Sequence, residues 1–220
     1  MQYQHLIDAK KTELPVGKVI CVGLNYAAHA QELNNPLPDE PVLFIKPSTA
    51  IVSLTAPIVI PSHYGHCHFE TELAILIGQP LSSGSTEQQA RQAIIGVGLA
   101  LDLTLRDLQQ KLKENSLPWE KAKAFDGACP LSGFIGIDSI GNLQDLTLKF
   151  WQNGQLRQTA HTGQMLVPVL SLLTYASQFF TLQPGDVLLT GTPSGVGALK
   201  SGDQLELSLS ELLTITTTVA

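Results

Sequence analysis

The most informative stretch of the sequence is residues 68–78, which read His68-Phe69-Glu70-Thr71-Glu72-Leu73-Ala74-Ile75-Leu76-Ile77-Gly78. The apolar run that ends at Gly78 predicts a buried strand over residues 69–78. Side chains alternate between the two faces of a strand, so Glu70 and Glu72 would point the same way at its start. Two adjacent carboxylates repel each other and lose hydration when buried, unless a cation lies between them. The alternative is a solvated strand end, where glutamates are ordinarily found.

A third carboxylate, Asp102, ends a second apolar segment, Gly96-Val97-Gly98-Leu99-Ala100-Leu101. The small and apolar residues before it predict deep burial, and a buried carboxylate needs a cation or a set of hydrogen bonds. Asp102 could instead cap the helix that follows it. Three carboxylates without a converging Cys/His set favour a hard cation that prefers oxygen ligands, Mg²⁺ or Mn²⁺, with Ca²⁺ as an alternative. His66 and His68 flank the cluster, where an H-x-H pair is more typical of a surface or supporting position than of a zinc ligand.

The rest of the chain predicts more strands than helices. Further strands are expected over residues 19–23, 41–45, 50–60, 95–101, 146–151, 155–159, 187–190 and 205–209. Helices are expected over residues 25–33, 86–93, 104–115 and 167–180. Asn25 is a candidate N-cap of the first helix, Asn34-Asn35-Pro36 its end, and Ser85 with Gln88 a capping box for the second. The absence of regular β-α-β alternation favours a mixed, mainly β fold of the α+β class with short peripheral helices.

Composition limits the classes of function. The chain has 220 residues, of which 44% are hydrophobic and 15% charged, and its net charge is -6. Its Lys and Arg residues are scattered, with no basic run longer than Lys10-Lys11, so no nucleic-acid partner and no anionic membrane surface is expected. The most apolar stretch, residues 94–101, is too short to span a bilayer, and residues 1–8 lack the order of a signal peptide. We expect a single domain over residues 1–220 with a lead-in at residues 1–17.

The cysteines also bear on where the protein works. Cys21, Cys67 and Cys129 are widely spaced and contain no CxxC pair. They predict reduced, buried thiols rather than a disulfide framework or a zinc site. We therefore expect a cytoplasmic protein.

Several short motifs together resemble one family, the fumarylacetoacetate hydrolase family. They are VGLNYAAH at residues 22–29, FIKP at 44–47, ETE at 70–72, ALDLTLRD at 100–107, WEKAKAFD at 119–126, NG at 153–154 and TGTPSGVG at 190–197. Each motif is weak alone, but seven occur in the family's order between Lys18 and Asp203. Leu24 departs from the pattern, because many members have a polar or basic residue there.

The resemblance implies a mixed β-sandwich roll, a homodimer, and Mg²⁺ or Mn²⁺ bound by Glu70, Glu72 and Asp102. The short length is similar to the compact branch of the family that acts on acylpyruvates and oxaloacetate, so the substrate implied is a small 2-oxo acid. A divalent cation can chelate the carboxylate and keto oxygens of such a substrate and polarise its carbonyl.

Other residues receive roles through the same resemblance. His29 and Glu32 lie three residues apart, on one face of the first helix, where they could activate water; without the family they would be an ordinary surface pair. Lys123 could stabilise negative charge on a substrate oxygen, or form an ion pair with a cluster carboxylate. Three more residues are candidates for substrate binding, namely Arg106, Gln109 and Thr192. Arg106 could instead pair with an acid, and the Thr192 segment could be only a tight turn.

Three reactions suit this set of residues. Hydrolysis of acylpyruvates to pyruvate and a carboxylic acid ranks first, because the His29–Glu32 pair is present. Oxaloacetate enol–keto tautomerisation or decarboxylation ranks second, and an isomerase or decarboxylase of aromatic degradation third. A 2-oxo acid binding protein without turnover is the non-enzymatic alternative, and the intact His29, Glu32 and Lys123 argue against it.

Overall fold

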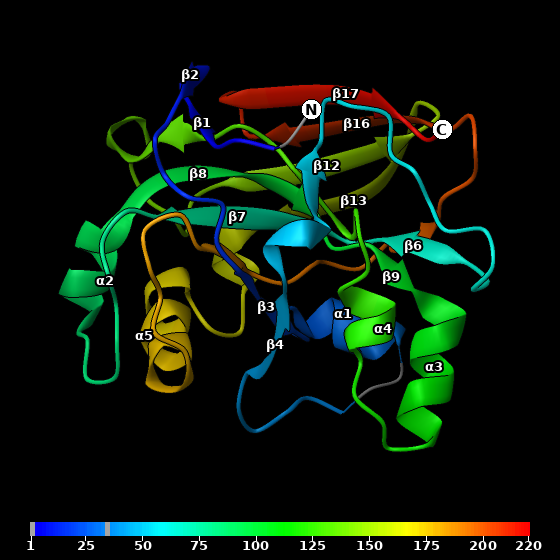
Figure 1. The fold of residues 1–220 in the computed structure, drawn as a ribbon, viewed down its shortest axis with the longest axis horizontal. Coiled ribbons are helices and arrows are strands. Elements are labelled where there is room, and N and C mark those ends of the chain that lie inside the picture. Colours follow the sequence, from blue (N-terminus) through cyan, green and yellow to red (C-terminus); the bar gives the residue numbers. More distant parts are fainter. Residues whose placement is uncertain (1–2, 34–35) are drawn as a thin grey trace.

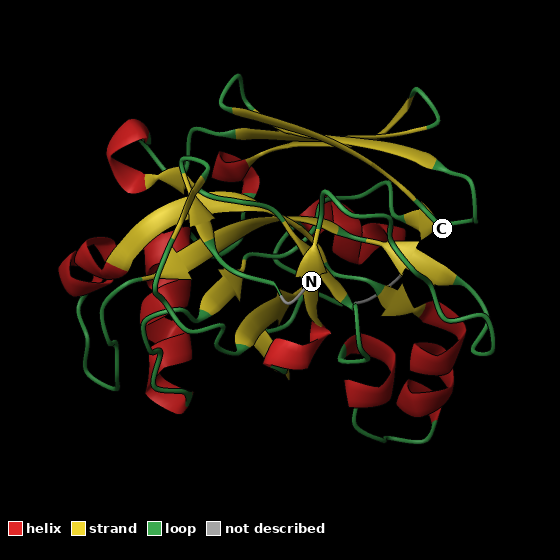
Figure 2. Cartoon of the chain, turned by 45° about the horizontal axis from the view of Figure 1, so that its top comes forward, coloured by secondary structure: helices red, strands yellow, loops and turns green. Residues whose placement is uncertain are grey.

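Strands dominate the computed structural model, which describes residues 3–33 and 36–220, and they form sheets that lie in layers (Figures 1 and 2). The largest sheet has eight strands in the order β4-β3-β14-β7-β8-β10-β5, with β11 beside β8. Their bounds are β3 Val19–Gly23, β4 Val42–Lys46, β5 Ile51–Ser53, β7 Thr71–Ile77, β8 Ile94–Leu101, β10 Cys129–Leu131, β11 Ile135–Gly136 and β14 Val187–Leu189. The sheet is mixed, because β14 runs parallel to β3 and β10 parallel to β5 while the other pairs are antiparallel.

A four-stranded antiparallel sheet covers one face of the large sheet, and helices lie on the opposite face of the large sheet (Figure 2). The four-stranded sheet consists of β13 Gln155–His161, β12 Thr147–Gln152, β16 Gln204–Leu209 and β17 Leu213–Thr218. Smaller sheets are built from β15 Gly197–Ala198, β6 Cys67–Phe69 and β9 Thr104–Leu105, and from β1 Leu6–Ile7 and β2 Lys10–Lys11. The α-helices are α1 Ala27–Glu32, α2 Glu87–Ala93, α3 Arg106–Glu114, α4 Glu120–Lys123 and α5 Val169–Phe179, and short 3-10 turns cover Ser48–Ala50, Ile137–Ser139 and Thr162–Gln164. The expected mainly β fold with short peripheral helices is confirmed.

Strand β7 is buried on both faces, which explains its unbroken apolar sequence. Leu73 and Ile75 belong to the core shared with the four-stranded sheet, whose Phe150 ring lies 4.3 Å from the ring of Phe69. Leu76 and its neighbours on the opposite face belong to a second apolar cluster. Burying each such side chain stabilises the fold by roughly 1.5–3 kcal/mol.

The lead-in at the amino end covers this second cluster. In Figure 1 it runs in front of β8 and β7 before entering β3. The Tyr3 hydroxyl donates to the Ser132 carbonyl at 3.2 Å, and the buried His5 ring places Nε2 3.0 Å from the Gly185 carbonyl. The lead-in is therefore part of the folded layer structure.

Several predicted boundaries were wrong, each for a local reason. The strand expected over residues 50–60 ends at Ser53, because the Ala56 amide turns back to the Ser53 carbonyl at 3.1 Å. The helix expected over residues 104–115 begins at Arg106, because Thr104 and Leu105 pair with β6. The capping box of α2 is shifted by one residue to Thr86 and Gln89, which exchange bonds of 2.8 and 3.3 Å.

The structure also tests the predicted ends of α1 and the predicted state of the cysteines, and it contains a strand that was not predicted. Tyr26, rather than Asn25, is the N-cap residue of α1, and Asn34 and Asn35, which predicted the end of that helix, lie outside the described residues. All three cysteines are buried and free, as predicted. Strand β17 was missed, although exposed and buried side chains alternate along residues 214–217. Within the described residues, no helix is long and apolar enough to cross a membrane.

Candidate active site

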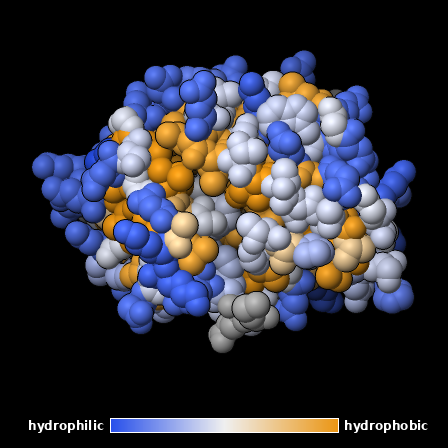
Figure 3. Space-filling view, turned by 90° about the horizontal axis from the view of Figure 1, so that it is seen from above, coloured by the Kyte–Doolittle hydropathy of each residue, from blue (hydrophilic) through white to orange (hydrophobic). Residues whose placement is uncertain are grey.

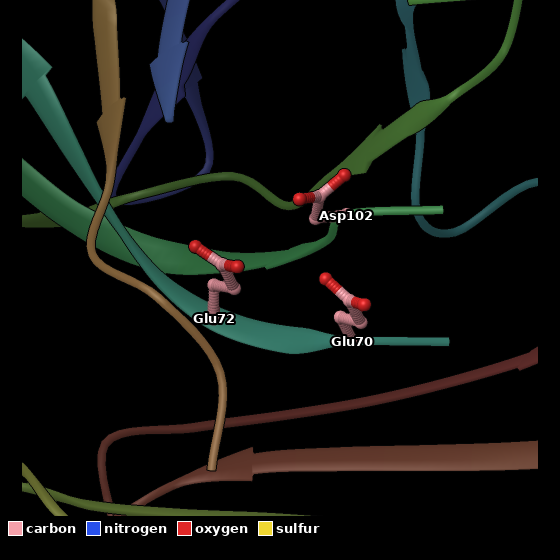
Figure 4. Close-up of side chains that lie close together, drawn as sticks. All are labelled: Glu70, Glu72 and Asp102. Atoms are coloured by element: carbon pink, nitrogen blue, oxygen red, sulfur yellow. The ribbon is translucent and has the colours of Figure 1, made fainter. Parts of the chain in front are cut away.

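Antiparallel pairing of β7 and β8 brings the three predicted carboxylates together. Thr71 pairs with Leu101, so Glu70 lies opposite Asp102, whose amide donates to the Glu70 carbonyl at 2.8 Å. Glu70 and Glu72 point to the same side, as alternation predicted, and all three carboxylates face one space (Figure 4). One oxygen from each lies within 4.8 Å of the others, and all three side chains are buried.

Cationic side chains surround two of the three carboxylates. Lys123 of α4 donates to Glu70 Oε2 at 2.8 Å and to Asp102 Oδ2 at 2.7 Å. Lys46 of β4, which is fully buried, lies 2.7 Å from Asp102 Oδ1, and Arg106 pairs with Glu70. Lys123 and Arg106 thus form the ion pairs with acids that were the alternatives to direct roles on the substrate.

Glu72 differs from the other two carboxylates because no cation contacts it among the described residues. Its Oε2 accepts a bond of 2.6 Å from the Gly191 amide. Burial, with the charges of Asp102 and Glu70, raises the pKa of Glu72 well above its ordinary value. Burial also raises the pKa of Glu70, but Lys123 and Arg106 outweigh it and hold that pKa below its usual range.

This charge distribution fits a divalent cation. The donors are all carboxylate oxygens, which hard ions prefer, and Glu72 lacks the positive charge that a metal would supply. Over residues 3–33 and 36–220, the triad is the only group of three His, Cys, Asp or Glu side chains close enough to hold one ion. His66 instead contacts the exposed Asp107 at 3.0 Å, as expected for a residue outside the metal site.

The predicted His29–Glu32 pair forms on α1. Nδ1 of His29 lies 3.3 Å from Glu32 Oε2, and the Gly195 amide donates to both Glu32 oxygens at 3.0 and 3.2 Å. His29 is buried and lines the same cavity as the carboxylate triad. Glu32 therefore holds a histidine that faces the triad's cavity.

The three residues predicted to bind substrate line this cavity as well. Arg106 donates to Gln109 Oε1 at 2.7 Å. Thr192 Oγ1 accepts a bond of 2.8 Å from Gln158, so its own hydroxyl proton is available to a ligand. The remaining wall is largely apolar and includes Leu24, Leu33, Val42, Phe44 and Trp119.

Comparison with known proteins assigns the chain to a family. Residues 18–220 match the family model described as the C-terminal part of fumarylacetoacetate (FAA) hydrolase. The chain belongs to the fumarylacetoacetate hydrolase family. Among its relatives, the oxaloacetate tautomerase YcgM of Escherichia coli is 51% identical over 209 residues, covering 94% of this chain and 95% of YcgM. A mitochondrial oxaloacetate decarboxylase of Dictyostelium discoideum is 42% identical over 89% of each chain.

A solved family structure has the same fold. Fumarylpyruvate hydrolase from Pseudomonas aeruginosa, in complex with Mn²⁺ and pyruvate, superposes with a TM-score of 0.92 at 33% identity, covering 100% of this chain and 96% of the other. The fumarylacetoacetate hydrolase fold expected from the motifs is thus confirmed. The buried triad of this chain is a site that could hold a metal ion of the kind that this family member binds.

Two polar residues of this family site had no predicted role. Lys46 lies in the quoted FIKP motif, and a lysine that ends an apolar strand between Ile45 and Pro47 was a signal that could have been used. Gln158 offered no such signal. It bonds the Thr71 amide at 3.0 Å as well as Thr192, and so joins the triad strand to the loop after β14.

Proposed function

We propose that this protein is a metal-dependent oxaloacetate enol–keto tautomerase. The observation that carries the proposal is one cavity that combines the buried carboxylate triad with His29, Lys123 and Arg106. Among the three candidate reactions, tautomerisation is favoured because relatives that cover nearly the whole chain are oxaloacetate tautomerases. The second-ranked prediction thus replaces acylpyruvate hydrolysis as the leading hypothesis.

Glu70, Glu72 and Asp102 would hold Mg²⁺ or Mn²⁺, which, when bound, polarises the carbonyl of a 2-oxo acid. His29 is the group placed to move a proton, because Glu32 orients its ring toward the triad's cavity. In the keto-to-enol direction, His29 takes a proton from C3, the C2–C3 double bond forms, and the C2 oxygen gains a proton from the imidazolium. The reverse sequence returns the proton to C3.

Lys123 stabilises negative charge on the C2 oxygen during this transfer. Burial lowers the pKa of Lys123, but Asp102 and Glu70 outweigh it and raise that pKa above its usual range. The side chain therefore stays an ammonium donor and does not act as the base. Thr192 and Gln109 are the uncharged donors that orient the substrate carboxylate.

Hydrolysis of acylpyruvates is the second candidate. The same His29–Glu32 pair could activate a water molecule, and the Pseudomonas aeruginosa neighbour is a fumarylpyruvate hydrolase. Decarboxylation of oxaloacetate remains a variant of the first candidate, in line with the Dictyostelium relative.

The test follows the ultraviolet absorbance of enol-oxaloacetate in the presence of Mg²⁺ and then of EDTA. Pyruvate release from acetylpyruvate and from oxaloacetate is measured in parallel. We expect the protein to tautomerise oxaloacetate faster than the spontaneous reaction. EDTA should abolish this catalysis, and His29→Gln and Glu32→Gln should each reduce it. Pyruvate release from acetylpyruvate without tautomerisation would make the protein a hydrolase. No turnover in any assay would make it a 2-oxo acid binding protein.

We further propose that the protein is a homodimer, as the family resemblance implies. Apolar areas on the face seen from above, bordered by hydrophilic side chains, support a contact between subunits (Figure 3). Sedimentation velocity should give twice the monomer mass, and a single monomeric species at micromolar concentration would contradict it.

A further inference from the structure

Two cationic side chains of the cavity, Arg106 and Lys113, have no role in the scheme above. Arg106, Gln109 and Lys113 follow one another at intervals of three and four residues on α3, and all three line the cavity. Lys113 is half-buried, and its Nζ lies 5.2 Å from the centre of the Trp119 ring, which lines the same cavity. This cation–π contact places the ammonium group at the cavity wall.

Lys113 differs from the other lysines and the arginine of the site in lacking an acid partner. Lys123 and Arg106 contact Glu70, and Lys46 contacts Asp102. Across the described residues, no carboxylate lies within ion-pair distance of Lys113. Burial, and then the positive charge of Arg106, lower the pKa of Lys113, so its charge lies in surroundings that disfavour it. An anion in the cavity would compensate this charge.

We propose that Lys113 binds the second carboxylate of a dicarboxylic 2-oxo acid and so determines the substrate class. The inference rests on the proposed function, which assigns the 2-oxo carboxylate end of the substrate to the triad. The distal carboxylate then needs a cation of its own, and the other cations contact the triad. Trp119 positions the ammonium, while the apolar Val42 and Phe44 offer no competing acceptor.

The geometry also predicts that monocarboxylic 2-oxo acids bind more weakly than dicarboxylic ones. A monocarboxylic 2-oxo acid would leave Lys113 uncompensated, so it gains nothing from this side chain. A charge-assisted hydrogen bond contributes about 1.5–3 kcal/mol, which corresponds to roughly a tenfold to hundredfold preference for the dicarboxylic substrate.

The experiment compares Lys113→Met with Lys111→Met, which removes a charge from an exposed position of the same helix. Binding to the Mg²⁺-loaded protein is measured by calorimetry with 2-oxoglutarate and 2-oxobutyrate, and KM and kcat are measured with oxaloacetate. We expect Lys113→Met to weaken 2-oxoglutarate binding and raise the KM for oxaloacetate at least tenfold, with 2-oxobutyrate binding and kcat nearly unchanged. Lys113→Arg should keep most of the wild-type affinity for 2-oxoglutarate. Lys111→Met should leave binding, KM and kcat unchanged.

The outcomes separate this inference from the proposed function. A wild-type protein that prefers 2-oxoglutarate through Lys113 but turns over no oxaloacetate would support the inference and refute the tautomerase. An active wild type whose Lys113→Met variant keeps its ligand preference would refute the inference alone. Equal weakening of both ligands, or no preference in the wild type, would assign Lys113 a structural role against Trp119.

Discussion

Replacing Glu72 with Gln should stabilise the metal-free protein, although it changes a fully buried residue of the candidate metal site. Burial and the two neighbouring carboxylates raise the pKa of Glu72 above its ordinary value of 4.5. The folded protein therefore retains a proton that the unfolded chain releases as the pH rises. The stability contributed by this proton is fully present below pH 4.5 and is lost as the pH rises through the folded pKa.

The size of the effect follows from linkage. From the ordinary pKa of 4.5 up to pH 7, a loss of about 1.4 kcal/mol per pH unit amounts to at most about 3.4 kcal/mol. The amide side chain of the Glu72→Gln variant would have no proton to lose and would still accept the bond from the Gly191 amide. For a chain of this length, 1 kcal/mol corresponds to about 2–4 °C, so the Tm of the variant should be higher by at most about 7–14 °C at pH 7 in EDTA.

Thermal unfolding of both proteins in EDTA between pH 4 and pH 7 measures this difference. The two Tm values should coincide near pH 4 and diverge as the pH rises. With excess Mg²⁺ the order should reverse, because the wild type gains stability by binding the ion and the variant binds it weakly. A variant that is less stable than the wild type in EDTA at pH 7 would refute the account of Glu72 as an uncompensated carboxylate.

Three further predictions concern groups around the site and the lead-in. Lys46→Met should lower the free energy of unfolding by about 3 kcal/mol in urea, because it leaves one oxygen of buried Asp102 without its cation, whereas Lys121→Met at an exposed position should have little effect. Burial lowers the pKa of His5, so wild-type stability should fall as the pH drops below 6.5, and His5→Gln should flatten that dependence; parallel curves would contradict it. Burial raises the pKa of Cys129 to about 12, so a thiol reagent should modify it only as fast as the protein unfolds, and rapid labelling of the native protein would contradict its burial.

The sequence was most informative where one element determines the local geometry. Alternation along β7 predicted that Glu70 and Glu72 share a side, and the spacing on α1 predicted the His29–Glu32 contact. Both follow from residue spacing within one strand or helix, which does not depend on the rest of the fold. The approach of Asp102 to the glutamates was predicted through its apolar segment and the family resemblance.

Features that depend on pairing between segments far apart in the sequence were harder to predict. Helix α3 starts late because Leu105 pairs with Cys67, and nothing in the local sequence indicates that partner. Lys46 at the end of β4 contacts Asp102 after β8, although β3, β14 and β7 lie between these two strands in the order of the sheet. Gln158 reaches Thr71 across two sheets. Such contacts join segments dozens of residues apart, and their geometry comes from tertiary packing rather than from local pattern.

The charges around the cavity connect the metal site to the substrate class. Four carboxylates and four cationic side chains lie in or next to it, namely Glu32, Glu70, Glu72 and Asp102 with Lys46, Arg106, Lys113 and Lys123. With all of these ionised and His29 acting as a neutral base, the side chains balance one another, so a divalent cation leaves a net charge of about plus two. A dicarboxylate neutralises that charge, whereas a monocarboxylate leaves half of it uncompensated in a partly apolar cavity. The same balance that makes Glu72 unfavourable without metal therefore favours a dianionic 2-oxo acid once the metal is bound.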